Sequence, residues 1–104
     1  MTSRPQASPR EAYLVSHTHW DREWYLPFHE FRVQLLDVVG GVLDALERDP
    51  DFEHFCLDGQ AIALEDYLAV RPEDAVRVRR LAAEGKLSLG PWYVLPDEFL
   101  ISSE

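Results

Sequence analysis

Two histidines and an aspartate stand close together near the start of the chain, in the segment HTHWDREW of residues 17–24. Alternate side chains of an extended segment point to the same side, so His17, His19 and Asp21 can converge on one ion. Imidazole nitrogen and carboxylate oxygen together suit zinc or a similar divalent cation. Ligands from one short segment need one or two more from elsewhere, so the spacing predicts part of a metal site.

Polar side chains also follow two later apolar runs. Asp58 and Gln60 come directly after residues 52–57, and Asp97 comes shortly after residues 86–90. Each run is short and apolar, which indicates a buried strand, as does the run of residues 13–17 at the first cluster. Three polar clusters thus stand where three predicted strands end, and Asp97 is the carboxylate that could complete the metal site.

Helical spacing separates the predicted strands. After Pro27, apolar residues recur every three to four positions, which predicts a long helix with one buried face. These residues are Phe31, Leu35, Val39, Leu43 and Leu46. The pair Gly40-Gly41 inside this pattern predicts a break or a close helix contact, since each glycine costs about 1 kcal/mol relative to alanine. Residues 61–70 resume helical spacing, and Pro72 opens a third helix.

The order of these elements is strand, helix, strand, two helices, strand, which is typical of a parallel sheet with right-handed crossovers. The sequence therefore predicts an α/β protein with about three parallel strands. In barrels and open parallel sheets, active sites form at the carboxyl ends of the strands. All three polar clusters would share that edge, which favours an enzyme.

The charge balance argues against a nucleic-acid partner. The 104 residues carry 19 acidic and 10 basic side chains, a formal net charge of −9, which repels a phosphate backbone. The basic cluster of Arg77, Arg79 and Arg80 lies towards the end of the third predicted helix, where cations complement the helix macrodipole. With 46% hydrophobic residues, the composition is that of one globular domain.

Targeting signals are not evident in the sequence. No window reaches the roughly 18 apolar residues of a membrane span. The polar first residues contain no apolar stretch that would make a signal peptide. We therefore expect a cytoplasmic protein with no membrane partner, in which residues 1–11 are a disordered lead-in and residues 12–104 form the folded part.

The chain resembles glycoside hydrolase family 38, the zinc-dependent retaining α-mannosidases, over residues 12–104. Three groups of motifs carry the resemblance: HTHWDREWY at residues 17–25, LDGQ with LEDY within residues 57–67, and GPWY at residues 90–93 leading to Asp97. The resemblance implies a catalytic α/β barrel of seven strands, of which the three strand-helix units would be the start.

The family's His-x-His-x-Asp motif implies that His19 and Asp21 hold zinc. His17 matches the first histidine, which is not a ligand in the family. Asp97 matches the aspartate that is both a zinc ligand and the nucleophile on which a glycosyl-enzyme intermediate forms, and Trp24 matches the tryptophan that packs against the bound sugar. A carboxylate beside a divalent cation stays ionised at neutral pH, as a nucleophile must.

The resemblance also implies what the chain lacks. Retaining hydrolysis needs a second carboxyl group about 5 Å away that acts as acid and base. The family's acid/base aspartate and its fourth zinc ligand belong to later segments. We therefore expect residues 12–104 to be the N-terminal portion of the catalytic barrel, incomplete at the carboxyl end and inactive alone. An unclosed sheet leaves apolar surface exposed, so such a piece would be marginally stable or form a homo-oligomer.

The leading expectation is thus a zinc-dependent α-mannosidase of mannose metabolism, with a mannose-containing oligosaccharide or glycoside as its substrate. The alternative within the family is a hydrolase for mannosylglycerate or its phosphorylated form. Outside the family, a metal-dependent amidohydrolase-type barrel would need both histidines on the metal, which the in-phase Asp21 and the Pro96-Asp97 turn argue against. A non-catalytic carbohydrate-binding module would bind sugar without turnover.

Overall fold

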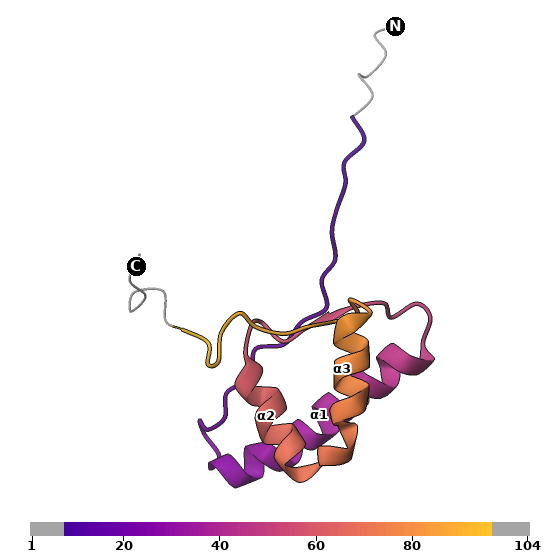
Figure 1. The fold of residues 1–104 in the computed structure, drawn as a ribbon. Helices are drawn as coiled ribbons and strands as arrows, with labels where there is room; N and C mark the ends of the chain where they lie inside the picture. The colour runs from indigo at the N-terminus through magenta and orange to yellow at the C-terminus, as the bar shows by residue number, and fades with distance from the viewer. Residues whose placement is uncertain (1–7, 97–104) are drawn as a thin grey trace, which may run out of the picture.

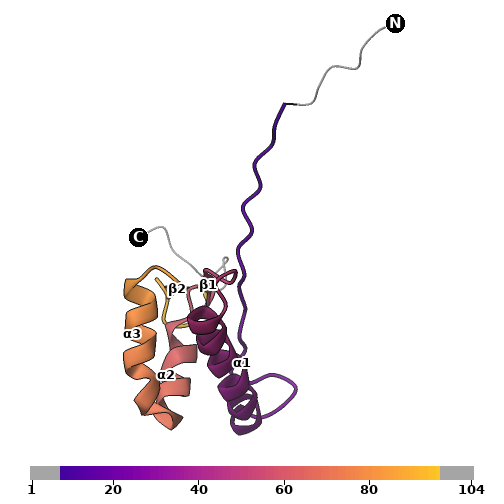
Figure 2. The same cartoon turned by 90° about the vertical axis from the view of Figure 1, so that its right-hand side faces the viewer.

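Helices make up most of the ordered secondary structure in the computed structural model, which describes residues 8–96. Helix α1 packs against both α2 and α3 and runs across them (Figure 1), and two short strands lie near the upper ends of the helices in Figure 2. No helix in the described part is long and apolar enough to cross a membrane. In chain order the elements are α1 (Phe28–Arg48), β1 (Phe55–Cys56), α2 (Ala61–Val70), the 3₁₀ helix η1 (Pro72–Asp74), α3 (Ala75–Ala83) and β2 (Leu87–Ser88).

Helix α1 confirms the long helix that the sequence predicts after Pro27. The Pro27 carbonyl accepts hydrogen bonds from the backbone N–H groups of Glu30 and Phe31, at 3.0 and 3.2 Å, which closes the first turn. The helix runs without a break through both glycines, so the predicted break is wrong. The predicted close contact is present on one side, because a Cβ atom added to Gly40 would lie 3.5 Å from the Tyr67 hydroxyl of α2. The buried residues are the five that the spacing predicts, namely Phe31, Leu35, Val39, Leu43 and Leu46.

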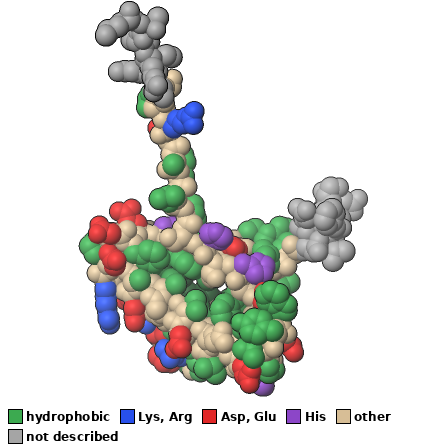
Figure 3. All heavy atoms as spheres, turned by 180° about the vertical axis from the view of Figure 1, so that it is seen from behind, with side chains coloured by type: hydrophobic (Ala, Val, Ile, Leu, Met, Phe, Trp, Pro, Cys, Tyr) green, Lys and Arg blue, Asp and Glu red, His purple; other side chains and the backbone are tan. Residues whose placement is uncertain are grey.

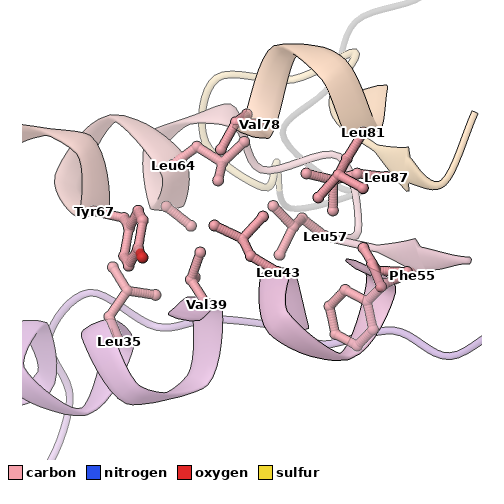
Figure 4. Close-up of a cluster of buried hydrophobic side chains, with 12 residues drawn as sticks. Leu35, Val39, Leu43, Phe55, Leu57, Leu64, Tyr67, Val78, Leu81 and Leu87 are labelled. Carbon is pink, nitrogen blue, oxygen red and sulfur yellow. The ribbon is translucent and has the colours of Figure 1, made fainter. Parts of the chain in front are cut away.

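One apolar core lies between α1 on one side and α2 and α3 on the other (Figure 4). Leu35 and Leu43 from α1, Tyr67 from α2 and Leu81 from α3 are its largest fully buried side chains. Truncation of a buried leucine to alanine in such a core costs about 2–5 kcal/mol. The strands contribute Phe55 and Leu87 to the same cluster, so the core joins the sheet to the helices.

Strands β1 and β2 pair in parallel, as the order of the elements predicts. Phe55 lies opposite Leu87, and the N–H group of Phe55 donates to the carbonyl of Lys86 at 2.9 Å. The N–H group of Leu57 donates to the carbonyl of Ser88 at 3.2 Å. The crossover between the strands consists of α2, η1 and α3. Both strands are shorter than the predicted runs of residues 52–57 and 86–90.

The first predicted strand is corrected by the structure, because residues 13–15 are exposed rather than buried. Tyr13 is 86% exposed and Leu14 is 97% exposed, and this segment extends away from the body of the molecule (Figure 1). Pairing begins only at Ser16, whose carbonyl accepts the N–H group of Cys56 at 2.9 Å, and a parallel bridge joins His17 to Cys56. Strand β1 is two residues long, so it offers no partner for the residues before Ser16.

The arginines of α3 join that helix to α1. Arg77 donates to Asp44 at 2.6 Å and to Asp74 at 3.1 Å, and it also donates to Glu47. Arg80 donates to the second oxygen of Glu47 at 2.6 Å. Burial disfavours the charge of Arg77, but its hydrogen bonds to these carboxylates raise its pKa. Ion pairs with α1, more than the helix macrodipole, therefore account for these two cations. We call the two arginines and their partners Asp44, Glu47 and Asp74 the Arg77 cluster.

Candidate functional site

A cleft of about 380 Å³ lies where the polar segments that follow the strands come together. Figure 3 shows histidine and acidic side chains close together on the face where the extended N-terminal segment joins the body. Residues 19–23 form one wall, and the start of α2 and the segment after β2 form the others. The residues that line the cleft are His19, Trp20, Asp21, Arg22, Glu23, Gln60, Ile62, Val94 and Leu95.

His19 and Asp21, the two ligands expected from the first motif, lie side by side in this cleft. The Nε2 atom of His19 is 3.2 Å from Oδ1 of Asp21, and each side chain is about half exposed, at 51% and 44%. Two ligands of one tetrahedral zinc ion, each about 2.0–2.1 Å from the metal, stand about 3.3 Å apart. The spacing and the donor types of this pair therefore fit two ligands of one zinc ion.

His17 does not join this pair, so the expected convergence of both histidines and Asp21 is wrong for the described structure. Its Nδ1 atom lies 2.8 Å from Oδ1 of Asp58. The physical reason is the parallel bridge between His17 and Cys56, which sets the histidine beside the strand whose exit carries Asp58. The structure thus contains two separate pairs, His17 with Asp58 and His19 with Asp21.

The Asp58-Gly59 turn directs the end of β1 towards the first motif. The N–H group of Gln60 donates to the carbonyl of Leu57 at 2.9 Å, and the φ angles of Asp58 and Gly59 are 50° and 81°. Two positive φ angles inside a four-residue turn are the pattern of a type I′ turn, which Asp-Gly sequences favour. Glycine also leaves room for Trp92, because a Cβ atom at Gly59 would lie 3.0 Å from Cδ1 of that indole, which would then have to shift by a few tenths of an ångström.

Gln60 connects this turn to the segment that carries the two expected ligands. Its side chain accepts a hydrogen bond from the Trp20 N–H group at 2.7 Å and donates to the Trp20 carbonyl at 2.8 Å. Trp20 stands between His19 and Asp21 in sequence. Gln60 is 5% exposed, so its amide is committed to this backbone and is not free to bind substrate. Gln60 therefore joins the exit of β1 to the first motif.

A second contact from α2 holds the residue after Asp21. Arg22 forms two hydrogen bonds with Asp66, at 2.7 and 3.0 Å, and its guanidinium lies 4.9 Å from the centre of the Phe28 ring. The hydrogen bond to Asp66 raises the pKa of Arg22, although partial burial opposes this. Asp66 is buried, and a paired arginine is what allows a carboxylate to be buried there. Sequence reasoning missed this pair, and the acid on the apolar face of α2 was the available signal.

The segment after β2 lies beside the start of α2. The first N–H groups of that helix, at Ala61 and Ile62, donate to the carbonyls of Trp92 and Tyr93 at 3.0 and 2.9 Å. These bonds satisfy donors that a helix start otherwise leaves unpaired. The chain then contributes Val94 and Leu95 to the cleft. Asp97, the expected nucleophile and third ligand, follows two residues later in sequence and lies outside the described residues.

The described aromatic residues of the first motif differ in their surroundings. Trp24 is 76% exposed and its ring centre lies 5.8 Å from that of Tyr25, so it is open to a ligand. Trp20 is partly buried and its ring meets Phe31 edge-on at 6.1 Å, as a packing residue does. The expected role of Trp24 against a sugar stays a prediction.

Residues 8–96 contain no group of three or more histidine, cysteine or acidic side chains that could hold a metal ion. Within that range, His19 and Asp21 supply two expected ligands, and the third, Asp97, is not among the described residues. A larger hollow of about 560 Å³ lies near the end of α1 and the turn before β2. None of the residues expected to act in the site lines it, so it stands apart from the predicted chemistry.

Comparison with known proteins places this architecture in one family. Residues 9–104 match the model of the glycosyl hydrolases family 38 N-terminal domain. The crystal structure of an alpha-mannosidase from Enterococcus faecalis V583 superposes with a TM-score of 0.79 at 56% identity, over 86% of this chain and 10% of that one. A second family 38 structure from Enterococcus faecalis gives a TM-score of 0.74 at 50% identity, over 88% of this chain and 10% of that one.

A similar sequence is the "Putative mannosylglycerate hydrolase" of Halalkalibacterium halodurans, 47% identical over 95 residues, which are 91% of this chain and 11% of that protein. The chain therefore belongs to glycoside hydrolase family 38, as its motifs predict. It spans about a tenth of the length of these relatives. Family membership sets aside the amidohydrolase-type alternative.

Proposed function

We propose that this chain forms the N-terminal part of the catalytic domain of a retaining α-mannosidase, which hydrolyses terminal α-mannosidic bonds with the help of zinc. The family match supports a glycoside as the substrate class. The similar alpha-mannosidase from Enterococcus faecalis supports the choice of mannose. In this proposal residues 12–104 supply the first strand-helix units of a seven-stranded α/β barrel, and later segments supply the remaining ligand and the acid/base.

The observation that carries the proposal is the His19–Asp21 pair in the cleft. The two donor atoms are 3.2 Å apart, are half exposed and face a cleft that the segment leading to Asp97 also lines. His19, Asp21 and Asp97 are therefore the proposed zinc ligands. When bound, the cation would hold sugar hydroxyls and support ionisation of the nucleophile.

The proposed roles of this chain's own residues follow from that arrangement. Asp97 attacks the anomeric carbon, and a covalent glycosyl-enzyme intermediate forms on its carboxylate. The leaving oxygen takes its proton from an acid outside this chain. Trp24 offers an exposed indole face against which a sugar ring can pack. Because the acid/base group lies elsewhere, the 104 residues alone are proposed to be inactive.

A mannosylglycerate hydrolase is the second candidate. The observation that favours it is the 47% identity to the relative from Halalkalibacterium halodurans. Both candidates share the proposed metal site and nucleophile, and they differ in the group that leaves. A comparison of kcat/KM for p-nitrophenyl α-mannoside and for mannosylglycerate on the full-length gene product distinguishes them. A ratio above about 100 for either substrate would correspond to about 2.7 kcal/mol of discrimination and would decide between them.

The test of the metal site is elemental analysis of the full-length gene product. We expect near-stoichiometric zinc in the wild type and loss of zinc in His19→Ala, Asp21→Ala and Asp97→Ala. His29→Ala and Asp37→Ala are matched controls, because both residues are exposed on α1 away from the cleft, and both should retain zinc. A wild type that binds no divalent metal, or that keeps it in all three ligand variants, would contradict the proposal.

A further inference from the structure

We propose that Gln60 is a positioning residue for the metal site, which holds His19 and Asp21 in register through the backbone of Trp20. This inference rests on the proposed zinc site and goes beyond it by assigning a role to a residue that would touch neither metal nor sugar. Gln60 is buried at the start of α2, yet it is polar and lies on the wall of the cleft. The hydrogen bonds of the Gln60 side chain therefore indicate its role.

The contact is reciprocal and local to the ligands. The Gln60 side-chain oxygen accepts from the Trp20 N–H group at 2.7 Å, and its side-chain nitrogen donates to the Trp20 carbonyl at 2.8 Å. Two hydrogen bonds to one residue fix both the position and the rotation of its backbone. Since Trp20 is bonded covalently to His19 and to Asp21, this fixes the backbone from which both ligand side chains leave.

The glutamine is itself held from two directions. Its own N–H group donates to Leu57 in the tight turn, and it forms a parallel bridge with Trp92. Gly59 in that turn approaches Trp92 so closely that a Cβ atom would lie 3.0 Å from the indole. The segments that follow β1 and β2 thus fix the position of Gln60. Through its hydrogen bonds to Trp20, Gln60 in turn fixes the backbone of the first motif.

The other flank of the ligand pair is held by charge. Arg22, next to Asp21, forms its two hydrogen bonds with the buried Asp66 on α2. Two contacts therefore hold the segment of the His19–Asp21 pair. Trp20 is bonded to Gln60, the residue that precedes α2, and Arg22 is bonded to Asp66 of α2. Metal sites require their ligands to be held within about 0.5 Å of the productive geometry, and loss of a residue that orients a ligand typically lowers metal affinity 10- to 100-fold.

The test compares variants of two glutamines in the full-length gene product. Gln60→Ala removes both bonds, Gln60→Asn shortens the reach by one methylene, and Gln60→Glu keeps the acceptor but loses the donor to Trp20. Gln34, an exposed glutamine on α1, supplies the matched controls Gln34→Ala and Gln34→Glu. The measurements are zinc affinity by competition with a chelator, the visible absorption of the cobalt-loaded protein, and hydrogen exchange of the Trp20 amide without metal.

We expect Gln60→Ala and Gln60→Asn to bind zinc about 10- to 100-fold more weakly and to change the cobalt spectrum, with Gln60→Glu intermediate. The Trp20 amide should exchange faster in these variants without metal, while amides of α1 stay protected. Both Gln34 variants should match the wild type. If Gln60→Ala does not fold, Gln60→Glu and its Trp20 exchange rate decide the question.

Three outcomes would overturn the inference. Wild-type zinc affinity and cobalt spectrum in the folded Gln60 variants would overturn it, and loss of zinc in His19→Ala would then leave the proposed function intact. An equal loss of zinc affinity in Arg77→Gln, which weakens the fold far from the cleft, would assign the effect to stability alone. Absence of metal from the wild type would overturn the proposed function and this inference together.

Discussion

Buried or half-buried polar contacts hold two regions of the molecule, the α1–α3 interface and the first motif. The two regions differ in how much apolar packing accompanies these contacts. The Arg77 cluster joins α1 to α3, whose apolar faces already meet in the core. Gln60 and Asp66 instead attach residues 20–22 to α2. Within that segment Trp20 packs partly against the core, but Trp24 and Tyr25 just after it are exposed, so apolar packing contributes less than between the helices.

This difference separates two roles of polar contacts. Between the helices they add stability, and at the first motif they affect the placement of the ligand residues. Between α1 and α3, ion pairs add to a packed interface that would keep the helices together without them. At the first motif, the hydrogen bonds from Gln60 and Asp66 add to the packing of Trp20 against the core, and we propose that they set the position of the expected ligands. Polar substitutions in the helical region should therefore change the free energy of unfolding, and those at the first motif should change metal affinity as well.

Arg77→Gln should give the largest loss of stability among the polar variants. The substitution leaves Asp74 buried without its cation and removes the bonds to Asp44 and Glu47, so we expect the free energy of unfolding to fall by about 3 kcal/mol. Zinc affinity should stay within about twofold of the wild type. Urea denaturation and chelator competition measure the two quantities. A tenfold loss of zinc affinity in a folded Arg77→Gln protein would break the separation between the regions.

Arg22→Gln should lower both quantities. It strands the buried carboxylate of Asp66, and we expect a loss of about 2 kcal/mol in unfolding free energy together with about tenfold weaker zinc binding. The double variant Arg22→Gln with Asp66→Asn removes the stranded charge, so stability should recover in part while zinc binding stays weak. Arg79→Gln, an exposed position on α3, should change stability by less than about 0.5 kcal/mol. Recovery of zinc binding in the double variant would show that the charge, and not the placement of residues 20–22, controls the site.

The helical part of the fold follows closely from the sequence. The apolar spacing predicts α1 with its buried face, and residues 61–70 are helical as predicted. Local signals of this kind depend on neighbours three or four positions apart. The apolar run of residues 13–15 predicts burial wrongly, because burial of a strand depends on what covers it and the spacing of one segment contains no such information.

The site is predictable in its residue types and less so in its contacts. The pairing of His19 with Asp21 follows from their spacing, but the attachment of Trp20 to Gln60 spans 40 positions and leaves no periodic signal. The contact between α1 and α3 leaves a clearer signal in the sequence. The two acids of α1, Asp44 and Glu47, are three positions apart. The two cations of α3, Arg77 and Arg80, have the same spacing, so the acids of one helix can pair with the cations of the other.

Alanine substitution at two glycines separates backbone strain from crowding at the site. Gly59 and Gly85 both have positive φ angles, 81° and 75°, but only Gly59 has a neighbour that an added Cβ would meet. We expect Gly85→Ala to cost about 1 kcal/mol and Gly59→Ala about 2 kcal/mol, because the second also pushes on Trp92. Thermal unfolding measures the difference. Only Gly59→Ala should weaken zinc binding, and equal effects of the two variants on zinc would show that the turn does not place Gln60.

Asp74→Asn should have a small effect at neutral pH, about 1 kcal/mol, and this effect should depend on the pH. The hydrogen bond from Tyr67 and the one from Arg77 lower the pKa of Asp74, although its burial opposes this. A carboxylate with a lowered pKa in the folded state stabilises the fold above its unfolded pKa of about 3.9, and this contribution is lost as the pH falls through the folded-state value.

The unfolding free energy of the wild type should therefore decline below about pH 4 more steeply than that of Asp74→Asn. Asp37→Asn, at an exposed aspartate on α1, should decline as the wild type does. Hydrogen exchange of the Trp20 amide at neutral pH should be the same in all three proteins, because Asp74 contacts α3 and Tyr67 but neither Gln60 nor the first motif. Parallel acid profiles for the wild type and Asp74→Asn would show that the Arg77 cluster does not store pH-dependent stability, whereas faster Trp20 exchange in Asp74→Asn would show that the two regions are coupled through α2.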